Sequence, residues 1–195
     1  MAVFALGTIS SQAATVLLTN ASGASGELGE LLDGLDATDI GTSGSTVTVP
    51  GFISLEITLL SIASDEAGAT LNSLSGGFGI DFPGSGLSDD SDAFDSAFNE
   101  SASFSFNQDV EISSVSFVSF TGAEVFNFGG VSIADAAFSG NTFTFATPLA
   151  IAANTSFVME ATSGTVGIES FVLVPEPSTA LLGAISMLAL LRRRR

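Results

Sequence analysis

Cysteine, histidine, tryptophan, tyrosine and lysine are all absent from this sequence of 195 residues. Without His or Cys, the chain cannot form a Ser-His-Asp or Cys-His catalytic arrangement, a Cys or His zinc site, or a thiol redox centre. Because there is no Cys, there are no disulfides from which the redox compartment could be inferred. Any chemistry of this chain must therefore depend on carboxylates, hydroxyls, amides and the backbone.

Positive charge is almost absent as well. The first 191 residues hold all 21 Asp and Glu and no basic residue, and the four arginines occupy positions 192–195. A body of this charge repels phosphate backbones and has nothing to neutralise them, so nucleic-acid binding is excluded. Hydrophobic residues make up 46% of the chain, with 17 Phe, which is ample for the core of one domain.

Most of the chain consists of short apolar segments separated by Gly, Ser, Asn and Asp, a pattern typical of strands and turns. Alternation is clearest in SASFSFN, where Phe104 and Phe106 share a face, and in NTFTFA, where Phe143 and Phe145 share one. Nine strands are predicted, at 14–19, 45–49, 52–62, 101–107, 110–120, 123–128, 141–146, 156–161 and 166–172.

These segments predict an all-β fold, an antiparallel two-layer β-sandwich that is jelly-roll-like and spans residues 15–173. One helix is compatible with GELGELLDGLDATDI, because Leu28, Leu31, Leu32 and Leu35 follow helical spacing. Gly29 and Gly34 weaken that helix, so the pattern leaves its existence open.

The first 14 residues resemble the end of a secretory signal peptide. An apolar stretch at 2–9 is followed by small and polar residues, and Ala13 or Ala14 fits the position before a cleavage site. Since no basic residue precedes this stretch, we interpret 1–14 as a truncated signal peptide. The alternative is that residues 1–18 form the first strand of the domain.

The last 22 residues form a tripartite tail. Residues 179–191 are small and apolar. As a helix they would be about 20 Å long, which is shorter than the ~30 Å hydrocarbon core of a bilayer. Arg192, Arg193, Arg194 and Arg195 would stay at the cytoplasmic headgroups, with the acidic domain outside. The stretch before this short transmembrane helix, residues 174–178, contains two prolines and is predicted to be an extended linker.

The tail begins with Val174, Pro175, Glu176, Pro177 and Ser178 and continues with an apolar segment and terminal arginines. In sequence it resembles the PEP-CTERM sorting signal of Gram-negative bacteria. The resemblance covers about 22 of the 195 residues. It implies export by the Sec machinery, an inner-membrane precursor, and processing near Pro-Glu-Pro by an exosortase. It also implies a final place at the cell surface or in the extracellular matrix of a biofilm, with exopolysaccharide as a partner. The alternative is an ordinary tail anchor that contains Pro-Glu-Pro by chance.

Within the domain, the densest group of oxygen-bearing side chains lies at Asp89, Asp90, Asp92, Asp95, Asn99 and Glu100. Calcium prefers six to eight hard oxygen ligands, so this segment is a candidate Ca²⁺ site, although its spacing is not that of an EF-hand. The alternative is a solvated acidic loop that binds no metal.

We expect no enzymatic activity, because no pair of carboxylates stands out as catalytic and sugar sites ordinarily stack their ligands on Trp or Tyr. The sequence predicts a structural or binding protein of the surface or matrix. The competing class is a carbohydrate-binding module or a carboxylate-dependent glycoside hydrolase on the same sandwich. Two facing acids in one concave pocket would favour the hydrolase, and acids gathered on one loop would favour calcium.

Overall fold

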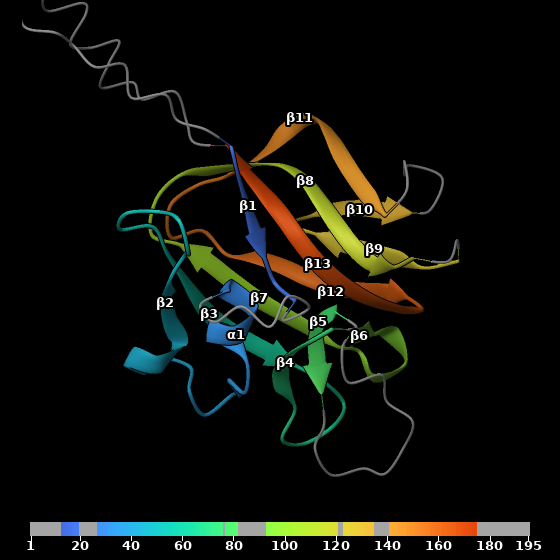
Figure 1. The fold of residues 1–195 in the computed structure, drawn as a ribbon. Helices are drawn as coiled ribbons and strands as arrows, with labels where there is room; N and C mark the ends of the chain where they lie inside the picture. The colour runs from blue at the N-terminus through green and yellow to red at the C-terminus, as the bar shows by residue number, and fades with distance from the viewer. Residues whose placement is uncertain are drawn as a thin grey trace, which may run out of the picture.

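The computed structural model describes residues 13–19, 27–75, 77–81, 93–120, 123–134 and 141–174 (Figure 1). Its helical elements are α1 (Leu28–Leu32), η1 (Ser43–Ser45) and η2 (Ser96–Phe98). Its strands are β1 (Ala14–Leu17), β2 (Thr46–Thr48), β3 (Glu56–Ala63), β4 (Thr70–Leu74), β5 (Gly77–Asp81), β6 (Phe94–Asp95), β7 (Ser101–Phe106), β8 (Val110–Ser119), β9 (Val125–Phe128), β10 (Val131–Ala134), β11 (Thr142–Ile151), β12 (Phe157–Ser163) and β13 (Thr165–Val174).

The strands form two sheets, and every strand pair is antiparallel. One sheet has the order β11-β8-β13-β5-β4, with β1 and β6 also paired to β13. The other has the order β10-β9-β12-β7-β3-β2. The predicted all-β architecture of two antiparallel layers is confirmed.

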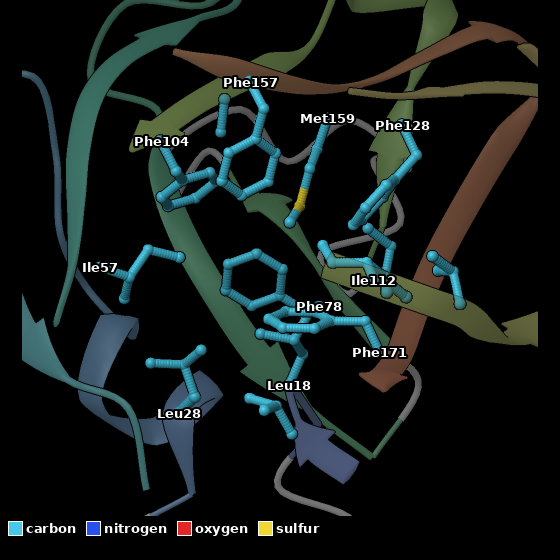
Figure 2. Close-up of a cluster of buried hydrophobic side chains, with 14 of the residues drawn as sticks. Leu18, Leu28, Ile57, Phe78, Phe104, Ile112, Phe128, Phe157, Met159 and Phe171 are labelled. Carbon is cyan, nitrogen blue, oxygen red and sulfur yellow. The ribbon is translucent and has the colours of Figure 1, made fainter. Parts of the chain in front are cut away.

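Phenylalanines join the two layers (Figure 2). Phe171 of β13 lies with its ring centre 6.5 Å from Phe106 and 6.3 Å from Phe128, which belong to the opposite sheet. Phe106 in turn stacks on Phe157 at 5.3 Å, with the ring planes 3° apart. Because aromatic side chains bury the most apolar area per residue, this network supplies much of the force that holds the sheets together.

The alternation predicted for these strands is confirmed. Phe104 and Phe106 are fully buried, and Phe143 and Phe145 pack against the core with their rings 5.0 Å apart. The Ser residues that alternate with Phe104 and Phe106 lie on the opposite face of β7, where Ser103 and Ser105 are also buried, and Ser103 pairs with Ser61 of β3 at 2.6 Å. Period-2 placement of Phe and Ser therefore separates an apolar face from a hydroxyl-bearing face in β7.

All nine predicted segments contain a strand, but four strands were missed: β4, β5, β6 and β10. Strand β5 reads GFGID, and glycines ordinarily argue against a strand. At Gly79 the Ala93 backbone occupies the space that a side chain would need, so this strand is glycine-rich because another chain segment lies directly on it. A two-glycine turn at Gly129 and Gly130, both with positive φ, was the available signal for β10.

The predicted strand at 52–62 is wrong in its first four residues, because β3 begins only at Glu56. Residues 49–55 form a loop in which Gly51 and Ser54 have φ of 83° and 62°. These left-handed conformations are incompatible with an extended strand. The helix compatible with GELGELLDGLDATDI is present but is only one turn long, since α1 ends at Leu32 and Leu35 packs on the core from outside it.

Strand β13 is central to its sheet, with β8 on one edge and β1, β5 and β6 on the other. The prediction that Val174 begins a linker is wrong, because Val174 is the last residue of β13 and pairs with Glu111. Ala14 likewise belongs to a strand and pairs with Leu173. Among the described residues, no helix is long and apolar enough to cross a membrane, and the predicted membrane helix at 179–191 lies outside them.

Candidate functional site

The long strands run between two ends of the sandwich, which we name by the residues gathered there. The exit pole holds Ala14, Val174, the 49–55 loop and the 107–110 turn. The acidic pole is the end of the sandwich opposite the exit pole, where β3 and β5 end and β13 begins. Its acids are Asp65, Glu66, Asp81, Asp95, Glu100 and Glu124. The exit pole carries the first and last strand residues of the described domain. The acidic pole carries more acidic residues than the exit pole does.

At the acidic pole, three of the six predicted calcium ligands are described, and each has a hydrogen-bonding role of its own. Asp95 caps η2 through its Oδ1, which accepts from Ala97 N at 2.7 Å, while its Oδ2 accepts from Thr165 Oγ1 at 3.1 Å. Glu100 is buried, and its Oε2 accepts from Asp95 N at 2.8 Å. Asp95 is thus the N-cap of η2, and Glu100, which follows the C-cap Asn99, accepts from the backbone N–H of that N-cap residue.

Asn99 faces a different acid. Its backbone is left-handed, with φ of 54°, and its Nδ2 donates to Asp65 Oδ2 at 2.6 Å. The backbone N–H of Asp65 donates to Phe98 O at 2.8 Å, so the turn after β3 is tied to η2 at two points. Sequence reasoning missed Asp65, since it is 34 residues from Asn99 along the chain.

The other three predicted ligands, Asp89, Asp90 and Asp92, lie outside the described residues. Within the part of the chain that the structure describes, no group of three or more acids is arranged to hold a metal ion. Asp95, Asn99 and Glu100 lie around η2, and the hydrogen bonds described above join their polar atoms to other parts of the protein.

A hollow of about 320 Å³ also lies at the acidic pole and contains two acids, Asp36 and Glu66. Hydrogen bonds from the Thr38 side chain and backbone, both 2.6 Å long, lower the pKa of Asp36 below its ordinary value. Glu66 Oε2 is buried and makes no hydrogen bond within the described residues. Of the two hollows described here, this one contains two acids, the residue type that a carboxylate-dependent hydrolase would need.

At the exit pole, a second hollow of about 350 Å³ lies between the 49–55 loop and the end of β13. Its wall includes Phe52, Ile53, Val110 and Val174. Ile53 is 97% exposed, whereas Leu74, another exposed large hydrophobic residue of the described part of the chain, is 44% exposed. Sequence reasoning placed Ile53 within a strand and so missed this feature; the PGF turn before it was the available signal.

No protein-family model matches this sequence, and no curated protein or solved structure matches it significantly. Apart from Val174, the predicted sorting signal lies outside the described residues. This applies to Pro175, Glu176, Pro177, Ser178, Arg192, Arg193, Arg194 and Arg195. The predicted signal peptide is also outside them except for Ala13 and Ala14. The resemblance of the tail therefore rests on its sequence.

Proposed function

We propose that this chain is an exported, non-enzymatic protein of the cell surface or extracellular matrix, sorted through its PEP-CTERM-like tail. The observation that carries the proposal is the tripartite order at 174–195: Pro-Glu-Pro, an apolar segment of 13 residues and four arginines. A chain with no other basic residue has no comparable signal elsewhere. In this proposal residues 179–191 form the short membrane helix, and the domain is a jelly-roll-like sandwich delivered by the Sec route.

The end of β13 supports this proposal. Strand β13, the central strand of its sheet, ends at Val174, the residue directly before Pro175. Pro at this position cannot donate a further ladder hydrogen bond. The domain can therefore be complete while the residues beyond Val174 are bound by a processing enzyme such as an exosortase.

Processing predicts a specific product in the native host. The protein recovered from the medium or matrix is expected to begin near Ala14 or Thr15 and to end between Pro175 and Ser178, without the four arginines. Intact mass and the C-terminal peptide check this, and Glu176→Gln should accumulate unprocessed in the inner membrane. Glu169→Gln, an exposed charge on β13, is the matched control and should be processed normally. Recovery solely from the inner membrane, with Arg192–Arg195 intact, would leave a plain tail anchor.

Calcium is a second part of the proposal, with Asp89, Asp90, Asp92, Asp95, Asn99 and Glu100 as ligands. Millimolar Ca²⁺ is expected to raise the midpoint of thermal unfolding more than NaCl of equal ionic strength, which screens the same charges without ligating. An Asp89→Asn, Asp90→Asn, Asp92→Asn variant should lose this difference. Asp109→Asn at the exit pole, which also removes negative charge, should keep it. Equal midpoints in Ca²⁺ and NaCl would remove calcium from the proposal.

The alternative class is a carbohydrate-binding module or a carboxylate-dependent glycoside hydrolase, and the hollow that holds Asp36 and Glu66 favours it. Host exopolysaccharide separates the three possibilities. Release of reducing ends that Glu66→Gln abolishes would establish a hydrolase. Saturable binding without release would establish a binding module or a matrix protein, and the location of the bound sugar would tell these apart.

A further inference from the structure

The 49–55 loop presents an apolar side chain in a fixed conformation. Two side-chain amides hold the carbonyl of Ser54, with Gln108 Nε2 at 2.6 Å and Asn107 Nδ2 at 3.0 Å. The loop is closed at its base by Val49 N, which donates to Leu55 O at 2.8 Å. Ile53 therefore projects from a loop whose backbone is held by hydrogen bonds on both sides of it.

The loop stands beside the points where the chain enters and leaves the sandwich. Leu173 and Val174 line the same hollow as Ile53, and Ala14 pairs with Leu173. Residues 1–13 and 175–195 consequently join the domain at this pole. Those two segments contain the apolar stretches 2–9 and 179–191, so the most apolar parts of the sequence connect to the domain next to Ile53.

Charge distinguishes this pole from the other. Glu56, Asp109 and Glu111 are the acids near the exit pole, where Glu56 Oε2 accepts from Asn107 Nδ2 at 3.2 Å and Asp109 Oδ1 accepts from Ala153 N at 2.7 Å. The acidic pole carries the six acids named above and also Asp36. A surface of negative lipid headgroups repels the acidic pole more strongly, which turns the exit pole toward the membrane.

We propose that the 49–55 loop docks on the lipid bilayer, with Ile53 inserted at the boundary between headgroups and acyl chains. This inference rests on the proposed membrane-anchored precursor and adds a defined orientation to it. The tail brings the exit pole to the surface, and Ile53 and the apolar edge of the adjoining hollow then leave water. The exit pole of the domain then faces the membrane and the acidic pole faces away from it, until the tail is cleaved.

A single labelled position tests this, because the chain has no native Cys. The full-length Ile53→Cys protein carries an environment-sensitive fluorophore and is reconstituted into vesicles of phosphatidylethanolamine and phosphatidylglycerol. We expect blue-shifted emission, protection from aqueous iodide and quenching by lipids with a spin label near the headgroup. Ala97→Cys, exposed in η2 at the acidic pole, is the matched control and should remain fully accessible to iodide.

The outcomes separate this inference from the function on which it rests. If the protein floats with the vesicles but iodide quenches positions 53 and 97 equally, the docking loop is refuted and the tail anchor stands. If the protein does not float, the anchor itself is refuted, and the orientation with it. If the fluorophore at position 53 is equally protected from iodide without vesicles, a second copy of this chain covers the loop. The proposal that the loop docks on the bilayer is then refuted.

Discussion

Replacing Phe171 with alanine is expected to lower the free energy of unfolding by about 3–5 kcal/mol, the cost typical of removing a fully buried Phe. The ring has no exposed surface and contacts Phe106 and Phe128 across the two layers. Its backbone is fixed between Val16 of β1 and Val115 of β8. Because strands pair on both sides, the backbone cannot shift far to close the cavity that the substitution leaves.

Urea unfolding followed by circular dichroism measures this effect, and Val172→Ala on the same strand is the control. Val172 is partly exposed on the outer face, paired with Thr15 and Ser114, so its truncation should cost about 1 kcal/mol or less. Equal losses for the two variants would mean that the layers are not joined through Phe171. A large loss for Phe171→Ala alone supports the packing of β13 as the central strand.

Phe171 also illustrates how far the sequence predicts the fold. Alternation of Phe or Val with Ser identifies β7 and β8, because a strand with one apolar face repeats every two residues. It does not identify β13, where the buried Ile168 and Phe171 are three residues apart across a shift in register. The same rule fails for Ile53, which continues the apolar run ahead of β3 but lies in a turn with positive φ at Ser54. What decides this loop is a pair of amides at 107–108, more than fifty residues away, and local pattern carries no information about them.

The acidic segment shows a similar limit. The sequence shows that Asp95, Asn99 and Glu100 lie within six residues of one another. It does not indicate that Asp95 caps η2, that Glu100 accepts from the Asp95 backbone, or that Asn99 binds Asp65. Hydrogen bonds to the backbone and to distant acids compete with a metal for the same oxygens, and these partners become apparent only once the strands are placed.

Gly29→Ala is the second substitution with a large expected effect, and its sign opposes helix propensity. In an exposed helix, Gly→Ala gains about 1 kcal/mol. At position 29 we expect instead a loss of about 1–3 kcal/mol, the usual cost of overpacking. A methyl group there would overlap the Leu18 carbonyl, which also accepts from Ser73 Oγ at 2.7 Å, so α1 would have to move off β1 and β4.

The glycine that weakens α1 as an isolated helix is therefore the residue that allows it to pack on the sandwich. Gly44→Ala in η1 is the matched control, because its φ is not positive and the nearest atom, Thr42 Oγ1, would lie at 3.5 Å from the new methyl. Thermal and urea unfolding should show little change for Gly44→Ala and a clear loss for Gly29→Ala. If Gly29→Ala were as stable as the wild type, the close packing of α1 against Leu18 would be wrong.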